Sequence, residues 1–235
     1  MTLLSIRDVS KRAREAQRER TILTDVSLDI EAAELVGIWG ARRSGRTTLL
    51  RIAAGIAAPD AGSVHFEGRD LARYRDETLG RGIGYVTKTL RAGEEQSVLE
   101  QVAAVLLARG VPVGRAREHA RGALTRAGAL ESAAMRVGEL AGVEAVRVAI
   151  AKALTLSPAL LVIDEPTASV ELAERDGILA LLRELASEGT AVLASTGAPE
   201  ELAGFHRVLT LGEGELRGAS SAGLAEVVAL RSRAV

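Results

Sequence analysis

The chain has 235 residues, a formal net charge of −1 and no cysteine; 47% of its residues are hydrophobic and 26% are charged. This composition is typical of a globular protein with a buried core, and it excludes a disordered chain, a disulfide scaffold, a thiolate zinc site and a cysteine nucleophile. The near-zero charge and the presence of only five aromatic residues argue against a dedicated nucleic-acid binder, which needs a basic surface and rings that stack on bases.

Two features of the apolar residues bear on membranes and export. No apolar run approaches the roughly 18 residues that cross a bilayer. In residues 1–20 the charges follow the apolar residues, which is the reverse of the order in a secretory signal. The sequence therefore predicts a cytoplasmic protein, or one held at a membrane through another chain.

The first part of the chain alternates predicted strands with one helix. Strands are predicted at residues 3–9, 22–30, 35–39, 64–66 and 83–86. A helix is predicted at 46–57, followed by a Pro-Asp-Ala-Gly turn at 59–62. The basic segment KRAREAQRER, residues 11–20, is expected to be a solvated hairpin loop or short helix, with a lipid or partner contact as the alternative.

The second part is more helical. An Ala-, Leu- and Arg-rich block over residues 98–153 is predicted to be helical, with breaks at Gly110, Pro112 and Gly114. Beyond it, strands are predicted at 159–163, 191–195 and 207–211, and helices at 178–187 and 222–231. Strands separated by helices favour a mostly parallel α/β sheet with an inserted helical block of about fifty residues.

A candidate phosphate-binding loop follows the third predicted strand, in LVGIWGARRSGRTTLL. Its spacing is that of G-x₄-G-K-[ST], a loop whose N–H groups hold phosphates while the hydroxyl ligates Mg²⁺. The lysine position, however, carries arginine, and a strand–helix turn without phosphate is the alternative. The candidate nucleotide-binding residues are Gly40, Ala41, Arg42, Arg43, Ser44, Gly45, Arg46, Thr47 and Thr48.

A second candidate element is LLVIDEPTAS, residues 160–169. It places Asp164 and Glu165 at the carboxyl end of an apolar strand, where a parallel sheet meets its ligand. There Asp164 can hold Mg²⁺ through water and Glu165 can polarise an attacking water as a candidate catalytic base. The alternative is a pair of solvated acids.

With these two elements, residues 3–216 resemble the nucleotide-binding subunit of an ABC transporter, and VGELAGVEAVRVAIAKALTLSPALLVIDEPTAS at 137–169 is especially specific. The resemblance implies an α/β fold: a P-loop NTPase (RecA-like) core, an antiparallel β subdomain and an inserted α-helical subdomain. One cassette domain would cover 1–220, with core and β subdomain at 1–87 and 155–220 and the helical subdomain at about 88–154. A C-terminal helix would cover 221–235.

Six positions depart from the family pattern at once, which favours drift under relaxed catalytic demand over deliberate inactivation. The signature, residues Leu140, Ala141, Gly142, Val143 and Glu144, has lost a serine and a glycine. The other departures are Arg46 for the phosphate-loop lysine, Lys88 for a glutamine, Glu171 for the D-loop aspartate and Gly197 for the switch histidine. Lys88 suits equally a nucleotide contact or an ion pair with a permease near residues 89–101.

The departures and the resemblance together predict a poor or inactive hydrolase. A planar guanidinium at Arg46 fits a tight cradle less well than an ammonium, and no aromatic residue precedes Trp39 to stack on adenine, so an arginine in 11–20 is the available replacement. ATP and Mg²⁺ are expected to bind weakly, with Thr47 and Asp164 at the metal.

The resemblance implies a peripheral subunit on the cytoplasmic face of the cell membrane. It would pair with a transmembrane permease and a second ABC ATPase subunit, more readily as a heterodimer than as a homodimer, and would bind no nucleic acid. One alternative is an active transport ATPase that uses Glu165. Another is a soluble cassette protein acting on ribosomes or DNA, whose relatives generally carry two cassettes or long coiled coils.

Overall fold

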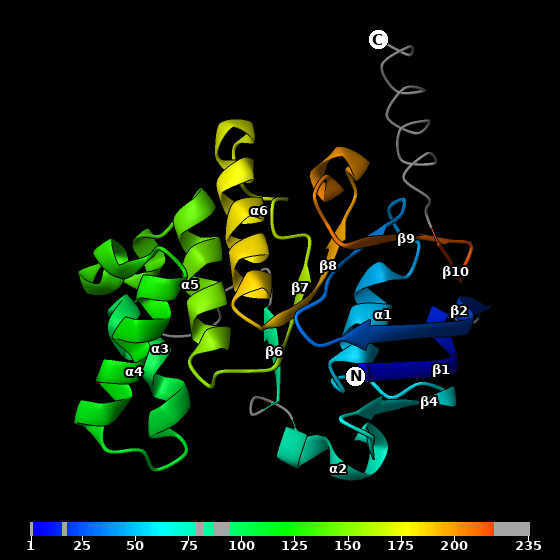
Figure 1. Cartoon of the computed structure of the whole chain (residues 1–235), viewed down its shortest axis with the longest axis horizontal. Coiled ribbons are helices and arrows are strands. Elements are labelled where there is room, and N and C mark those ends of the chain that lie inside the picture. The colour runs from blue at the N-terminus through cyan, green and yellow to red at the C-terminus, as the bar shows by residue number, and fades with distance from the viewer. Residues whose placement is uncertain (1, 16–17, 79–81, 87–94, 219–235) are drawn as a thin grey trace.

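The computed structural model describes residues 2–15, 18–78, 82–86 and 95–218. They form two sheets and a group of helices (Figure 1). The larger sheet has the order β10-β9-β3-β8-β7-β6, and its strands are β3 (Leu35–Trp39), β6 (Ile83–Val86), β7 (Leu160–Asp164), β8 (Ala191–Thr196), β9 (Arg207–Gly212) and β10 (Glu215–Gly218). Only β10 runs antiparallel to its neighbour. The predicted parallel α/β sheet is confirmed.

The larger sheet is buried on both faces. Along its strands, alternate residues point to opposite sides, as the period of two in a strand requires. Val162 and Leu193 pack into one core cluster with the smaller sheet, and Leu161 and Val192 pack into the other with the helices. These strands therefore read as continuous apolar runs, as parallel strands covered on both faces do.

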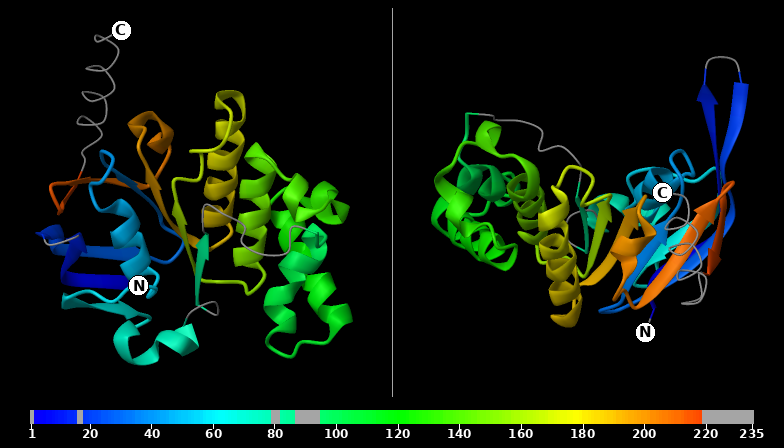
Figure 2. Two further views of the ribbon diagram at one scale, coloured as in Figure 1. Left: turned by 180° about the vertical axis from the view of Figure 1, so that it is seen from behind. Right: turned by 90° about the horizontal axis from the view of Figure 1, so that it is seen from above.

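The smaller sheet is antiparallel, in the order β2-β1-β4-β5, with strands β1 (Thr2–Glu15), β2 (Arg18–Glu31), β4 (Ala61–Phe66) and β5 (Arg69–Asp70). The expectation of a loop or short helix at 11–20 is wrong, because β1 and β2 continue their ladder to the pair Glu15–Arg18. The hairpin projects beyond the rest of the molecule (Figure 2, right). Cross-strand pairing satisfies the backbone there, and the charged side chains of Arg12 and Glu19 are exposed.

Helix α1 (Arg46–Ala53) lies between the two sheets and ends four residues before the predicted limit. Gly55 has φ of +70°, the Gly55 N–H donates to Ile52 O and the Ile56 N–H donates to Arg51 O. These are the two bonds of a Schellman motif, which closes a helix at a glycine in the left-handed region. Helix α2 (Leu71–Thr78), together with β5 and β10, is an element that the periodicity did not predict.

The inserted block contains α3 (Val98–Leu107), α4 (Val113–Arg126), the 3₁₀ turns η1 (Leu130–Ala134) and η2 (Val137–Glu139), and α5 (Gly142–Leu154). Gly114 does not break it, because α4 already begins at Val113 after Pro112. Helix α6 (Leu172–Ser187) begins six residues earlier than predicted, and the 3₁₀ turn η3 (Pro199–Leu202) follows β8. The predicted helices at 222–231 and 221–235 lie outside the described residues.

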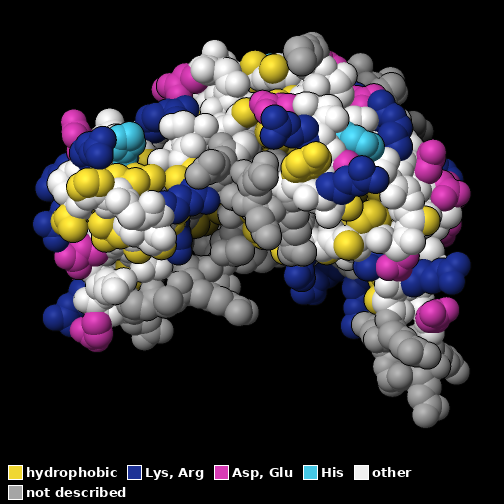
Figure 3. Space-filling model, turned by 90° about the horizontal axis from the view of Figure 1, so that it is seen from below, with side chains coloured by type: hydrophobic (Ala, Val, Ile, Leu, Met, Phe, Trp, Pro, Cys, Tyr) yellow, Lys and Arg dark blue, Asp and Glu magenta, His cyan; other side chains and the backbone are white. Residues whose placement is uncertain are grey.

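None of the helices in the described ranges combines the length and apolar character needed to span a bilayer. On the face drawn in Figure 3, basic and acidic side chains are interspersed, with no single continuous basic surface.

Candidate nucleotide-binding site

The loop between β3 and α1 requires glycine at both ends of its motif. A Cβ atom at Gly40 would lie 2.4 Å from the Leu211 carbonyl oxygen. Gly45 has φ of +104°, and a Cβ there would lie 2.8 Å from the Ile22 carbonyl oxygen. Both distances are shorter than a side chain tolerates, so the loop packs against β2 and β9 only because these two residues lack one.

The loop leads into the N-terminus of α1, whose N-cap is Gly45. The first N–H groups of a helix have no acceptor within it, and the helix dipole makes this end electropositive. The Ser44 hydroxyl is buried and, among the described residues, has no hydrogen-bond partner. A cradle closed by glycines, with a buried hydroxyl still lacking a partner, fits a phosphate chain.

A pocket of about 660 Å³ opens over this loop. Arg20 reaches it from β2 and donates to the Arg43 carbonyl oxygen at 3.2 Å. Arg20 was not among the predicted site residues, although the basic segment that contains it was expected to supply an arginine. The described lining residues are Arg20, Ile22, Arg42, Arg43, Ser44, Gly45, Arg46, Thr47, Thr48 and Glu165. Four arginines and one carboxylate therefore line the pocket.

None of the described lining residues is aromatic, and each of the five aromatic side chains in the sequence lies elsewhere. Phe66 is buried in the core, while Tyr85 and Phe205 pack against the two core clusters. Trp39 ends β3, and the exposed Tyr74 lies on α2. Stacking of an arginine on the base stays a prediction.

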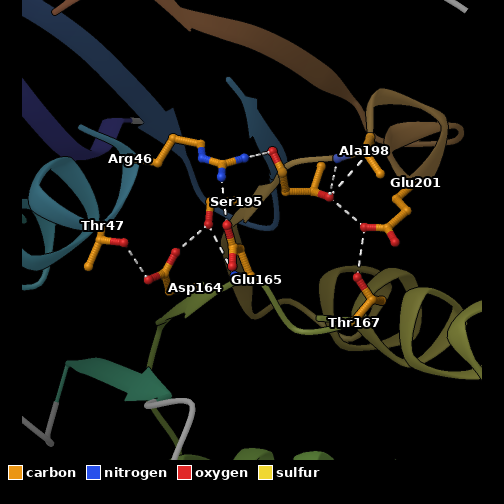
Figure 4. A network of polar contacts seen from close by, with 9 residues as sticks. Arg46, Thr47, Asp164, Glu165, Thr167, Ser195, Ala198 and Glu201 are labelled. Atoms are coloured by element: carbon orange, nitrogen blue, oxygen red, sulfur yellow. Dashed lines mark hydrogen bonds and ion pairs between the residues drawn. The ribbon is translucent and has the colours of Figure 1, made fainter. Parts of the chain in front are cut away.

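Asp164, at the end of β7, is held by hydroxyl groups on both sides. Thr47 Oγ1 donates to Asp164 Oδ2 at 2.7 Å, and Ser195 Oγ donates to Asp164 Oδ1 at 2.6 Å (Figure 4). Burial, and next the negative charge of Asp164, raise the pKa of the Tyr85 phenol on the neighbouring strand. A hydroxyl and a carboxylate beside a phosphate cradle are the protein ligands that suit Mg²⁺, which takes few from the protein and keeps several waters.

The candidate base Glu165 is engaged by the arginine of the phosphate loop. Arg46 Nη2 lies 2.6 Å from Glu165 Oε1, and Arg46 Nη1 donates to the Thr196 carbonyl oxygen. Arg46 is only 6% exposed and Glu165 is 27% exposed. The Glu165 N–H donates to Ser195 Oγ at 3.1 Å. The structure thus brings together Arg46, Thr47, Asp164 and Glu165, which come from the two predicted motifs.

A buried carboxylate continues this network away from the pocket. Glu201 Oε2 accepts hydrogen bonds from Thr167 Oγ1 and Thr196 Oγ1 (Figure 4). Glu201 Oε1 lies 3.0 Å from Arg175 Nη1. Thr196 therefore connects Arg46 with Glu201. Sequence reasoning missed Ser195, Thr196 and Glu201; two hydroxyl residues at the end of a buried strand were the available signal.

The remaining predicted residues lie elsewhere. The signature residues Leu140–Glu144 lie where η2 gives way to α5, and none of them is among the described residues that line the pocket. Glu171 is the N-cap of α6. Gly197 follows β8, beside the Arg46 guanidinium. Lys88 lies outside the described residues.

The chain is similar in sequence to known proteins. The ABC transporter family model matches residues 23–168. The chain is 36% identical over 219 residues to the lipoprotein-releasing system ATP-binding protein LolD of Chromohalobacter salexigens, covering 91% of this chain and 92% of LolD. It is 31% identical to the macrolide export ATP-binding/permease protein MacB 1/2 of Paracoccus denitrificans, covering 91% of this chain but 33% of that protein.

The fold is also that of a known cassette. The dimeric structure of MJ0796, a bacterial ABC transporter cassette, superposes with a TM-score of 0.83 at 25% identity, covering 91% of this chain and 96% of the other. Together with the family match, which spans more than half of the chain, and with the phosphate loop and Asp-Glu strand described above, this likeness identifies the chain as a member of the ABC transporter family, in the form of its ATP-binding cassette.

Proposed function

We propose that this chain is a degenerate ATP-binding half of a membrane ABC transporter, which binds nucleotide but hydrolyses it poorly. The observation that carries the proposal is the ion pair between Arg46 and Glu165. A carboxylate oxygen that accepts a short hydrogen bond from a buried guanidinium is already occupied, so it is not free to accept a hydrogen bond from an attacking water. The pair therefore removes the main candidate for polarising an attacking water.

ATP and Mg²⁺ remain the proposed ligands. The α1 N-terminus and the loop from Gly40 to Gly45 would hold the phosphates, and Thr47 with Asp164 would hold the metal. The metal, when bound, supplies charge neutralisation between the phosphates. The adenine ring of ATP would gain little binding energy, since the pocket offers it an arginine such as Arg20 and no aromatic residue among the described lining residues.

A permease is the proposed membrane partner. The name of the MacB relative joins ATP binding and permease in one protein, and this chain matches a third of it. We propose that here the cassette, one domain over residues 1–220 with a helical subdomain at about 88–154, docks as a peripheral subunit on the cytoplasmic face of the membrane. LolD is named as the ATP-binding protein of a lipoprotein-releasing system, so a lipoprotein is the cargo that this likeness favours.

A second cassette is the other proposed partner. The MJ0796 cassette forms a dimer, and in the family each site pairs the phosphate loop of one subunit with the signature of the other. A homodimer of this chain would combine Arg46 with Ala141 and Val143 in both sites. In a heterodimer with a complete cassette, one site would have an intact signature and the other an intact phosphate loop. Each site would then keep one intact half, which favours the heterodimer.

Affinity purification of the tagged chain from detergent-solubilised membranes tests this assembly. We expect two co-purifying proteins, identified by mass spectrometry: a polytopic membrane protein and a cassette with lysine in its phosphate loop. Recovery with ribosomes or DNA instead, after nuclease and high-salt controls, would support the soluble alternative and contradict the transporter role.

The alternative of an active transport ATPase rests on Glu165 as the base. It predicts that Glu165→Gln abolishes transport by the assembled complex, whereas the degenerate half predicts transport near the wild-type rate. The same substitution in the partner cassette provides the positive control, since it must stop transport in either case.

A further inference from the structure

The side chain of Arg46 crosses from the start of α1 to the ends of two strands. Its guanidinium contacts Glu165, directly after β7, and the carbonyl oxygen of Thr196, the last residue of β8 (Figure 4). Lysine has a side chain one bond shorter and ends in a single nitrogen in place of the planar fork, so it does not hold both acceptors in this geometry. The Arg46 side chain therefore joins the start of α1 to the carboxyl ends of β7 and β8.

The residue that follows Thr196 makes room for this guanidinium. A Cβ atom at Gly197 would have Arg46 Nη1 at 3.6 Å and Arg46 Nη2 at 3.7 Å as its nearest neighbours. These are ordinary contact distances, so a methyl group fits. Any side chain that continues beyond Cβ toward the guanidinium would occupy its space.

We propose that Arg46, Glu165 and Gly197 form one coupled unit, in which Arg46 is the positioning residue for Glu165 and supplies the cation that faces the terminal phosphate of a nucleoside triphosphate. Two of the six departures from the family pattern, arginine for lysine at 46 and glycine for histidine at 197, then compensate for each other. The arginine takes over the place that a histidine at 197 would fill, and glycine at 197 permits the arginine. The phosphate part of this inference rests on the proposed nucleotide-binding function, whereas the coupling does not.

The coupling is tested by thermal unfolding without nucleotide. Arg46→Lys should lower the melting temperature, because Glu165 and the Thr196 carbonyl lose their shared donor. Gly197→His should lower it by crowding the guanidinium. The double variant Arg46→Lys/Gly197→His should melt above both single variants, because the imidazole fills the space that the shorter lysine leaves.

Two further variants control this cycle. Gly197→Ala should have the same melting temperature as the wild type, since a Cβ atom fits at this position. Arg126→Lys, which changes an exposed ion pair with Glu188 on the surface, measures the effect of an arginine-to-lysine change without the coupled unit. Additive losses in the double variant would overturn the coupling.

The phosphate part is tested by displacement of a fluorescent nucleotide with ATP and with ADP. Arg46→Gln should lower the ratio of ATP to ADP affinity about tenfold, because it removes a charge-assisted contact and leaves the Glu165 carboxylate facing the terminal phosphate. An unchanged ratio would overturn the proposed contact of Arg46 with the terminal phosphate, whatever the melting cycle shows. Failure of the wild-type chain to bind either nucleotide would contradict the proposed function, with the melting cycle still decisive for the coupling.

Discussion

Ser195 connects the two acidic residues of the site. Its hydroxyl donates to Asp164 and accepts the N–H of Glu165, and the side chain is fully buried. We expect Ser195→Ala to lower the free energy of unfolding by about 1.5–3 kcal/mol, because a buried charged acceptor loses its donor. Urea denaturation measures this loss. Ser187→Ala, at an exposed position whose hydroxyl donates to Glu184 O, is the control and should change stability by less than about 0.5 kcal/mol.

Glu201 is the second residue with a testable structural role. Glu201→Gln replaces one acceptor oxygen by an amide and removes the charge that faces Arg175. The expected loss in unfolding free energy is on the order of 2 kcal/mol, measured by urea denaturation. The exposed neighbour Glu200→Gln is the matched control. If the two variants have the same free energy of unfolding, the contacts of Glu201 do not stabilise the fold.

At the residue scale, the sequence predicts what depends on spacing along the chain. Thr47 and Asp164 lie within hydrogen-bond distance of each other, since a helix start after one parallel strand and the end of another lie at the same edge of the sheet, and their role at a metal stays a prediction. The contact of Arg46 with Thr196 and Glu165 could not be predicted. It depends on strand order and on the open space at Gly197, both of which are tertiary.

At the scale of elements, α5 begins at the signature without a side-chain cap. Its N-cap is Ala141, in extended conformation with φ of −137° and ψ of 162°, and alanine has no acceptor for the free N–H groups. Ala141→Ser should therefore raise the free energy of unfolding by about 1 kcal/mol, measured by urea denaturation. Ala180→Ser, exposed within α6, should instead lower it slightly. A loss of stability in Ala141→Ser would contradict the capping argument.

Asp60, directly before β4, binds β1 beyond the last residue pair of the β1–β4 ladder. Lys11 Nζ lies 2.6 Å from Asp60 Oδ1, and the Arg12 N–H donates to Asp60 Oδ2 at 2.7 Å. The hydrogen bond from Lys11, followed by that from the Arg12 backbone, lowers the pKa of Asp60 below its usual 3.8. The charged carboxylate is therefore the form that stabilises the folded state.

This lowered pKa predicts a pH dependence of a definite sign. The stabilisation is present above the unfolded pKa near 3.8 and is lost as the pH falls through the lower folded value. Asp60→Asn should melt below the wild type at pH 7, and the difference should narrow below pH 4. A difference that stays constant between pH 7 and pH 3, measured by circular dichroism, would exclude this role of Asp60.

Element types follow from the sequence better than element limits do. The apolar runs of β3, β7 and β8 predict buried parallel strands because both faces of the sheet are covered. The strand character of residues 11–15 and 18–20 was missed because seven of the ten residues from 11 to 20 are charged, so this segment shows no apolar alternation to detect. The first turns of α6 were missed for a similar reason, since Leu172 is 80% exposed and carries no core signal.

For the molecule as a whole, two cores are joined through one sheet. One core contains α1 and the antiparallel sheet, the other contains α3 to α6, and the β7 and β8 strands contribute to both. The carboxyl ends of these shared strands carry the site residues Asp164, Glu165, Ser195 and Thr196, and the start of α1 carries Arg46 and Thr47. The class of fold was predictable from the order of strands and helices and from the resemblance. The placement of the helices on the sheet was implied only by the resemblance.

The most direct test of the degenerate ATP-binding half is phosphate release from ATP by the purified chain alone, at nucleotide and Mg²⁺ concentrations where binding is saturated. We predict a rate equal to that of the Glu165→Gln variant and of buffer, because Glu165 is held by Arg46. Sustained turnover by the wild-type chain, lost in Glu165→Gln, would contradict the account.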